Sequence, residues 1–159
     1  MTVQIQTISS LPNLPSIYAI YAKNSKVPVY IGQTTKLKNR ITQHLVRRDS
    51  SIVTGASGYS LDPDHVKRIS WWEHHLFVDE NNLTAAELIA FNQLNPIIRS
   101  QGNKKQSSQI LSDENFVQEM VQLFQGEPTG ELNIVDLNQA LQRISKLEDR
   151  IRKLEEKLK

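Results

Sequence analysis

Two tyrosines stand near the middle of two short apolar runs, SIYAIYA at 16–22 and VPVYIG at 27–32. A phenol with its ordinary pKa of about 10 is a poor base, so nearby positive charge or metal-bound water has to help it. Tyrosine is also common in β-hairpins, where it packs across strands. Tyr18 and Tyr30 are therefore either cross-strand packing partners or two phenols held together for chemistry.

Arg40 and His44 lie four residues apart in the segment KNRITQH, on one face of an expected helix. The planar guanidinium of arginine matches phosphate oxygens, and an imidazole that titrates near neutrality can act as a base. The alternatives are structural. Arg40 would be one of several solvated helix cations, and His44, on the apolar stripe with Leu37, Ile41 and Leu45, would be a core histidine.

Glu87 is a carboxylate that can bind a metal ion. It stands in a helix expected over 84–94, which stops before Pro96 because proline disfavours helix in the residue before it. The segment TAAE at 84–87 also fits a capping box, which alone would explain the glutamate. If the helix instead begins at Asn81 or Asn82, Glu87 is interior and free to bind metal.

The hairpin that must position the tyrosines is expected from strands at 16–23 and 27–33, joined by a turn at 24–26. Because side chains alternate along a strand, Tyr18 faces away from Tyr21. Thr35 can cap the following helix, residues 49–65 form a long loop, and 67–78 read as a third strand. In such a strand His74 and His75 point to opposite faces, and one of the two adjacent tryptophans faces the core.

The C-terminal third has a different character. Ser112 is expected to cap a short helix with an apolar side that includes Phe116, Met120 and Phe124, after which GEPTGE breaks the chain. The last 23 residues then place apolar side chains at heptad a and d positions: Leu137, Ala140, Ile144, Leu147, Ile151, Leu154 and Leu158. Oppositely charged pairs at g and e positions, Arg143–Glu148 and Arg150–Glu155, favour a parallel homodimer through 137–159. The alternative is an amphipathic helix folded back on its own domain.

Composition narrows the class of protein. The chain has 159 residues and no cysteine, which excludes disulfides and thiolate sites and is compatible with a reducing cytoplasm. No apolar run is long enough to span a membrane, and the N-terminus lacks a signal-peptide pattern, so we expect a cytoplasmic protein without a membrane partner. Residues 1–48 hold seven Lys and Arg and no acid, which points to a basic face for a polyanion rather than ordinary solvated surface.

Four pieces of sequence, in order, resemble the GIY-YIG nuclease family: SIY at 16–18, VYIG at 29–32, KNRITQH at 38–44 and AAELIAFNQLNP at 85–96. The resemblance covers roughly residues 15–100. It implies a small α/β (α+β) domain with a three-stranded antiparallel sheet flanked by helices. It also implies an endonuclease that hydrolyses phosphodiester bonds with one divalent metal, Mg²⁺ or Mn²⁺.

Site residues follow from the resemblance one position at a time. Tyr18 and Tyr30 match the tyrosines of the two motifs and would project onto one face of the sheet, with Tyr18 as base or water-positioner and Tyr30 as its support. Arg40 matches the arginine that stabilises phosphate charge, and Glu87 matches the metal-binding glutamate. His44 resembles a polar residue seen at that place in many members, and is the rival base.

Three departures from the family pattern are visible. Ser16 replaces a glycine, and Gln33 stands where a lysine is frequent. The asparagine that usually follows the helix proline is absent at its place, and its role falls to Asn95, Arg99 or Asn103. Ser16 bears on strand packing more than on chemistry. Gln33 and the altered asparagine position favour an alternative function, a catalytically weak or inactive nucleic-acid-binding or scaffolding dimer with the same fold.

The expected organisation has three parts: a nuclease-like domain at 1–105, a linker with a short helix at 106–131, and a coiled-coil dimerisation helix at 132–159. DNA is the expected substrate, and RNA is not excluded. The residues expected to bind nucleic acid are Lys36, Lys38, Arg47, Arg48, Arg99, Lys104 and Lys105.

Overall fold

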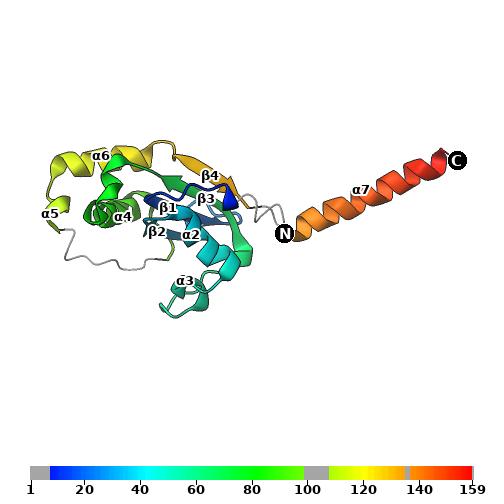
Figure 1. Cartoon of the computed structure of the whole chain (residues 1–159), viewed down its shortest axis with the longest axis horizontal. Helices are drawn as coiled ribbons and strands as arrows, with labels where there is room; N and C mark the ends of the chain where they lie inside the picture. Colours follow the sequence, from blue (N-terminus) through cyan, green and yellow to red (C-terminus); the bar gives the residue numbers. More distant parts are fainter. Residues whose placement is uncertain (1–7, 99–107, 135–136, 159) are drawn as a thin grey trace.

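The computed structural model describes residues 8–98, 108–134 and 137–158. Its centre is one antiparallel sheet with the spatial order β2-β1-β3-β4 (Figure 1). The strands are β1 (Ser16–Ala22), β2 (Tyr30–Thr34), β3 (Val66–Trp72) and β4 (Gly130–Asn133). The mixed fold with an antiparallel sheet and flanking helices is as expected, but the expected count of three strands is wrong, because β4 pairs with β3.

A turn at the expected place follows β1, but β2 begins at Tyr30 rather than at residue 27, so the connection is longer than predicted. Asn24 adopts the left-handed conformation with φ 65°, and the Ser25 amide donates to the Ala22 carbonyl. Alternate residues of β1 enter two different cores. One core holds Ile17, Ala19 and Tyr21, and the other holds Tyr18 and Ile20, as the alternation of the sequence predicts.

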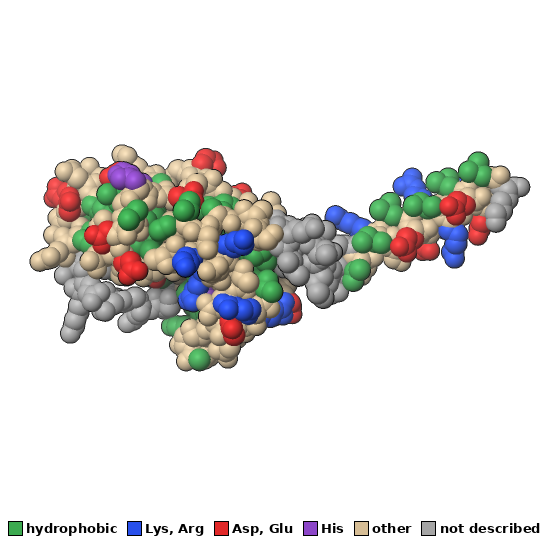
Figure 2. Space-filling view, viewed as in Figure 1, with side chains coloured by type: hydrophobic (Ala, Val, Ile, Leu, Met, Phe, Trp, Pro, Cys, Tyr) green, Lys and Arg blue, Asp and Glu red, His purple; other side chains and the backbone are tan. Residues whose placement is uncertain are grey.

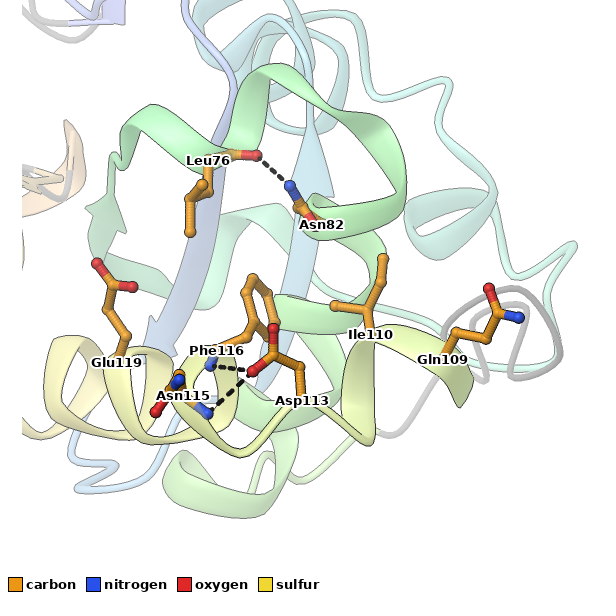
Figure 3. A pocket seen from close by; sticks show the side chains of 8 residues that line it. All are labelled: Leu76, Asn82, Gln109, Ile110, Asp113, Asn115, Phe116 and Glu119. Atoms are coloured by element: carbon orange, nitrogen blue, oxygen red, sulfur yellow. Dashed lines mark hydrogen bonds between the residues drawn. The ribbon is translucent and has the colours of Figure 1, made fainter.

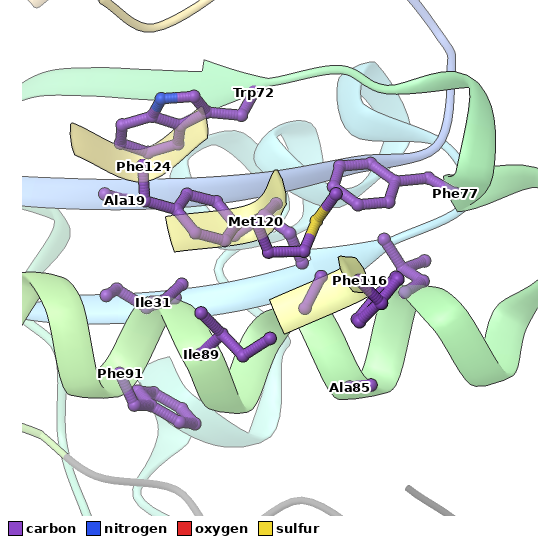
Figure 4. Packing of buried hydrophobic residues seen from close by; sticks show 14 of the residues in the cluster. Ala19, Ile31, Trp72, Phe77, Ala85, Ile89, Phe91, Phe116, Met120 and Phe124 are labelled. Carbon is purple, nitrogen blue, oxygen red and sulfur yellow. The ribbon is translucent and has the colours of Figure 1, made fainter. Parts of the chain in front are cut away.

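The apolar face of the sheet, defined by Ile17, Ala19 and Tyr21, is covered by α4 (Glu80–Leu94) and α6 (Glu114–Gln125). Figure 4 shows aromatic side chains and Met120 filling the space between these helices and the strands. Helix α4 begins earlier than the sequence predicts because the Asp79 carboxylate accepts from the Asn81 amide. Glu87 therefore lies in the helix interior, and the capping-box explanation for it is wrong.

Helix α6 also has a different cap from the predicted one. The carboxylate of Asp113, rather than the hydroxyl of Ser112, accepts from the backbone amides of Asn115 and Phe116. The ionised carboxylate suits the positive end of the helix dipole. Phe116, Met120 and Phe124 are buried against the sheet, as the apolar spacing predicts.

The site face of the sheet, defined by Tyr18 and Ile20, is covered by α2 (Leu37–Thr42) and the π-helical turn η1 (Gln43–Arg47). The expected cap at Thr35 is wrong: the Lys36 amide donates to the hydroxyl of Thr34. The segment 49–65, expected to be a loop, contains a short helix α3 (Ser51–Thr54) and a 3-10 turn η2 (Pro63–His65).

The third strand ends earlier than predicted, at Trp72. Beyond it the backbone amide of Glu73 donates to the hydroxyl of Thr129, and the chain enters the 3-10 turn η3 (His75–Val78). The expectation that His74 and His75 point to opposite faces is therefore wrong. Their rings stack with centroids 4.4 Å apart, because the strand no longer continues at these residues.

One row of residues runs across all four strands: Gly32, Tyr18, Trp71 and Gly130 are successive register partners. Each ring on a central strand lies over the glycine of its edge strand. A Cβ at Gly32 would approach the Tyr18 hydroxyl to 2.3 Å, and one at Gly130 would approach the Trp71 ring to 2.2 Å. Aromatic cover of edge glycines stabilises sheets, and here it requires glycine at both edges. Trp72 is the tryptophan that enters the apolar core.

The remaining described helices are α5 (Ser108–Leu111) and α7 (Leu137–Lys157). Helix α7 lies apart from the sheet and its helices (Figure 1). Ile144, Leu147, Ile151 and Leu154 on α7 are each more than half exposed. Among the described residues, no helix is long and apolar enough to cross a membrane.

The domain boundaries at 105, 131 and 132 stay a prediction. Residues expected to form a linker nevertheless contribute to the sheet domain, since α6 packs in the apolar core and β4 is hydrogen-bonded to β3.

Candidate active site

Three rings meet on the site face of the sheet. Tyr18 and Tyr30 come from paired strands, and their ring centroids are 6.1 Å apart. His44, from η1, lies 5.8 Å from the Tyr18 ring and 6.0 Å from the Tyr30 ring. Tyr18 and His44 have no exposed surface, and Tyr30 is 7% exposed. The two tyrosines and the histidine thus form one buried cluster.

Hydrogen bonds join the cluster to its surroundings. The Tyr18 hydroxyl is 2.8 Å from Nε2 of His44, and Nδ1 of His44 is 2.7 Å from Oγ of Ser50. The phenol ring of Tyr18 reaches this position by lying over Gly32, where no side chain obstructs it. The glycine of the segment YIG is therefore a steric requirement of the site.

Arg40 lies beside the same rings, on α2. Its guanidinium interacts with the hydroxyls of Tyr18 and Tyr30, and its NH1 donates to Oε1 of Gln43 at 2.7 Å. Its Nε is buried and makes no hydrogen bond within the described part of the chain. A buried donor without an acceptor costs free energy, and an anion oxygen would relieve that cost.

Glu87 comes from α4, which covers the other face of the sheet but packs against the edge strand β2. Its side chain is buried, with 6% of its surface exposed. Burial raises the pKa of Glu87 to about 7, although the positive charge of Arg40 partly opposes the rise. Arg40, which lies beside the ring cluster, is therefore close enough to Glu87 for its charge to act on the carboxyl group.

Burial is also the main cause of the pKa shifts of His44 and Tyr18. Loss of solvation, together with the charge of Arg40, lowers the pKa of His44 to about 3, so this imidazole is neutral at neutral pH. Burial, followed by the proximity of Tyr30, raises the pKa of Tyr18 well above its ordinary value, against the effect of Arg40. The resting pair is thus a neutral phenol hydrogen-bonded to a neutral imidazole.

The structure places Tyr18, Tyr30 and His44 in one cluster with Arg40 beside them, and the charge of Arg40 also acts on Glu87. Ser50 was missed, because sequence reasoning placed it in a loop rich in Ser, Gly, Asp and Pro. No local signal separates it from the neighbouring serine at 51, and only the fold shows that one is buried and the other exposed.

The residues expected to bind nucleic acid lie in two groups. Lys36, Lys38, Arg47 and Arg48 follow along α2 and η1, and Figure 2 shows Lys and Arg side chains gathered over this region of the surface. Arg48 is paired with Asp64 at 2.8 Å, so part of its charge is already neutralised. Arg99, Lys104 and Lys105 lie outside the described residues.

Of the three residues considered as replacements for the family asparagine, one lies in the described part of the chain and two do not. Asn95 ends α4 in the left-handed conformation with φ 52°, which explains an asparagine before Pro96 by backbone geometry alone. Arg99 and Asn103 lie outside the described residues.

A cavity of about 410 Å³ lies elsewhere, between α6 and the segment that leads into α4 (Figure 3). Its lining includes Leu76, Asn82, Phe116 and Glu119, and Asp113 points its carboxylate at the first turn of α6 rather than into an open site. The residues that line this cavity do not include any of the candidate catalytic residues Tyr18, Tyr30, Arg40, His44 and Glu87.

Comparison with known proteins gives a family and a set of structures. The sequence model of the GIY-YIG catalytic domain matches residues 14–101, more than half of the chain. No curated protein matches the chain. Solved structures that are similar include the GIY-YIG N-terminal endonuclease domain of UvrC from Thermotoga maritima bound to its catalytic divalent cation, magnesium. That structure has 19% identity and a TM-score of 0.42, covering 63% of this chain and 99% of the other.

An asparagine-to-alanine variant of the same UvrC domain, bound to its catalytic divalent cation, gives 19% identity and a TM-score of 0.42 over 64% of this chain and 99% of the other. The family match includes the elements that carry the candidate catalytic residues. These elements are β1, β2, α2, η1 and α4, which carry Tyr18, Tyr30, Arg40, His44 and Glu87 in that order. The resemblance seen in the sequence is thereby confirmed, and the chain belongs to the GIY-YIG nuclease family.

Proposed function

We propose that the chain is a metal-dependent endonuclease that hydrolyses phosphodiester bonds in DNA. The observation that carries this proposal is the cluster of Tyr18, Tyr30 and His44 with Arg40 beside it, and these residues come from separate elements of the fold. Glu87, from a further element, is within the electrostatic influence of Arg40. A core that needed only packing would have no use for this set of polar groups in one place, since each buried polar group costs free energy unless it is paired.

Arg40 has the properties of a phosphate-binding group. Its side chain is only partly buried, its charge is permanent, and one of its buried donors lacks an acceptor among the described residues. A phosphodiester that approached the cluster would accept from this guanidinium, which would stabilise the charge that develops on the phosphorus oxygens.

Glu87 fits a single hard cation. Among the described residues, no group of three or more His, Cys, Asp or Glu side chains is close enough to hold a metal. Mg²⁺ commonly takes one or two carboxylates and fills its other positions with water and phosphate oxygens, so one glutamate at a phosphate site is a sufficient donor set. When bound there, Mg²⁺ or Mn²⁺ would supply positive charge to the phosphate and to the departing 3′ oxygen.

Tyr18 and His44 act as one unit in the proposal, rather than as rival bases. An attacking water gives a proton to the Tyr18 oxygen as the phenol proton passes to Nε2 of His44, 2.8 Å away. The pKa of His44, about 3 in the resting site, has to rise for this step, and a bound phosphate that offsets the charge of Arg40 acts in that direction. The resulting hydroxide forms a bond to phosphorus as the bond to the 3′ oxygen breaks, and that oxygen leaves with the electron pair and takes a proton from water. Tyr30 supports the pair from the neighbouring strand. Because Tyr18 has no exposed surface, side chains above it must move for water to enter.

Cleavage of supercoiled plasmid with and without Mg²⁺ tests the function, with single-stranded DNA and RNA as parallel substrates. Wild type should nick the plasmid only with metal, and Glu87→Ala should not nick it at all. Glu80→Ala, an exposed acid in the first turn of the same helix, serves as the matched control and should behave as wild type. Wild type that binds DNA but never cleaves it would favour the alternative, a non-catalytic binding or scaffolding protein. Cleavage confined to RNA would change the substrate, and nicking by Glu87→Ala would remove it as metal ligand.

DNA is proposed to bind the basic surface of α2 and η1. Replacing Lys36, Lys38 and Arg47 together by Gln should weaken binding, and the log–log salt slope should flatten by about 0.9 for each phosphate that these cations no longer neutralise. Binding that did not depend on salt, or that survived the triple replacement, would place the DNA elsewhere. The cytoplasmic location stays a prediction from the sequence.

A homodimer through α7 is proposed as the assembly. The exposed Ile144, Leu147, Ile151 and Leu154 follow the a and d positions of one seam, and Arg150–Glu155 pairs across a parallel interface. Ile151→Asp should give a monomer in sedimentation that still nicks one strand but makes few double-strand breaks. Ser145→Asp, which adds the same charge at an outer b position, should leave the dimer intact. A wild-type chain that sediments as a monomer at high micromolar concentration would contradict the assembly.

A further inference from the structure

Ser50 is a buried serine whose hydroxyl serves no local purpose. It precedes α3 in the N-cap position, where a serine side chain normally accepts from a backbone amide of the first helical turn. Its side chain makes no such cap, and the amides of Val53 and Thr54 bond to its carbonyl oxygen instead. The hydroxyl is directed to Nδ1 of His44, at 2.7 Å.

The chain path makes this contact specific. The π-helical turn η1 ends at Arg47 and is followed by Arg48, which adopts the left-handed conformation with φ 58°. Residues 44 and 50 are thereby placed beside each other, and Ile52 anchors α3 in the core on the site face. Ser50 is 1% exposed, so water cannot replace its hydroxyl without a rearrangement.

From this geometry we infer that Ser50 is a positioning residue that holds His44 in the tautomer with its proton on Nδ1. In a neutral imidazole one nitrogen donates and the other accepts. If Nδ1 donates to the Ser50 oxygen, Nε2 is left with a free lone pair that faces the Tyr18 hydroxyl. The inference rests on the proposed function, because only in that reaction must Nε2 receive the phenol proton.

The neighbours of Tyr18 support this direction of hydrogen bonding. Arg40 can only donate, so the Tyr18 oxygen acts as acceptor toward the guanidinium and its own proton is available for His44. In the opposite tautomer Nε2 would also donate to the Tyr18 oxygen, and the phenol would have no base beside it. The arrangement parallels the way a third group orients the histidine of a nucleophile–base pair.

The ¹⁵N chemical shifts of the His44 ring test the inference on the full chain at neutral pH. They distinguish a protonated from an unprotonated ring nitrogen, and His44→Asn identifies the signals among those of the four histidines. In wild type, Nδ1 should be protonated and Nε2 unprotonated. In Ser50→Ala, both nitrogens should shift toward a mixture of the two tautomers, whereas Ser51→Ala, at the exposed neighbour, should leave the spectrum unchanged.

Cleavage provides the second readout. Loss of an orienting hydrogen bond typically lowers activity about 10- to 100-fold, so Ser50→Ala should fall in this range and Ser50→Thr, which keeps the hydroxyl, should recover most of the rate. A protonated Nε2 in wild type would overturn the inference without any variant. An unchanged tautomer and an unchanged rate in Ser50→Ala would also overturn it. Wild type that fails to cleave any nucleic acid would refute the proposed function, while the tautomer measurement would still decide the arrangement of His44.

Discussion

Both faces of the sheet bury apolar side chains, but the site face also buries a cluster of polar groups, although alternate residues of the same strand supply both faces. On the apolar face, Ala19 and its neighbours meet Met120 and Phe124 of α6 and a series of apolar residues from α4 (Figure 4). On the site face, Tyr18 meets a histidine, an arginine and, through the histidine, a serine. Both faces are closely packed, and on the site face a buried tyrosine and a buried histidine are joined by a hydrogen bond.

This difference indicates that one face mainly stabilises the fold, whereas the other also positions the reactive groups. Burial of apolar surface is the main source of stability, and the hydrophobic effect does not require a particular orientation of the side chains. Buried polar groups contribute little net stability but fix a unique geometry when each has its partner. We therefore expect substitutions on the apolar face to change stability, and substitutions on the site face to change the reaction.

The largest expected effect is on stability, from Phe124→Ala on the apolar face. Phe124 is 3% exposed and lies edge-to-face with Trp72, with centroids 5.5 Å apart. Its truncation should cost about 3–5 kcal/mol of unfolding free energy, measured by urea denaturation, while the folded fraction keeps its cleavage rate. Val78→Ala, at a largely exposed apolar residue, should be nearly neutral. A small loss for Phe124→Ala would mean that α6 is not part of the cooperative core.

Arg40→Ala should lower the cleavage rate and leave the stability nearly unchanged, the reverse of Phe124→Ala. Removing a group that stabilises developing charge typically lowers the rate about 10²–10³-fold, and the circular dichroism spectrum should remain that of the folded protein. Arg47→Ala, an exposed cation on η1, controls for a general loss of positive charge and should change the rate much less. If both variants lost activity equally, Arg40 would be one solvated cation among several.

The pH dependence of the unfolding free energy, compared between wild type and Glu87→Gln, should show how much stability is lost by burying the Glu87 carboxylate. The pKa of Glu87 is about 7 in the folded chain and 4.5 ordinarily, so the unfolded chain loses its proton first as pH rises. Wild-type stability should therefore fall between pH 4.5 and 7 and stay lower above it. Relative to wild type, the variant should gain up to about 3 kcal/mol at pH 8, and this gain should vanish near pH 4.5.

Urea denaturation with a chelator present measures this difference. The neutral His44 gives stability that is present above pH 6.5 and lost toward pH 3, but this contribution is common to both proteins and cancels. A stability difference that did not change with pH would show that the Glu87 carboxyl titrates normally in the fold.

The smallest effects should come from the two glycines that lie under aromatic rings. Gly32→Ala and Gly130→Ala each place a Cβ against a ring, which should cost about 1–3 kcal/mol. Only Gly32→Ala displaces the Tyr18 hydroxyl from His44, so only this variant should lose activity beyond its unfolded fraction. Equal activity in the two variants, measured where both are fully folded, would show that the reaction tolerates movement of Tyr18.

Short-range features of the site face could be read from the sequence. The alternation of β1 put Tyr18 and Tyr21 on opposite faces, and the four-residue spacing put Arg40 and His44 on one face of a helix. Strand β4 could not be read in this way, because four residues acquire strand geometry only when β3 offers partners about sixty residues away in the sequence. The start of α4 was also misplaced, since both Asp79 and Thr84 have side chains that can cap a helix.

The sequence by itself thus determined the family, the residues that could do chemistry and the faces on which strands and helices present them. These features depend on residue type and on repeats of two or about four positions, which the backbone geometry imposes locally. Only the tertiary structure decided which serine orients His44, why position 32 must be glycine, and which ionisable groups are neutral. The reason is physical. Desolvation and hydrogen-bond partners arise from elements far apart in the chain, such as Tyr18 and His44, and they exist only after the sheet and its helices have packed.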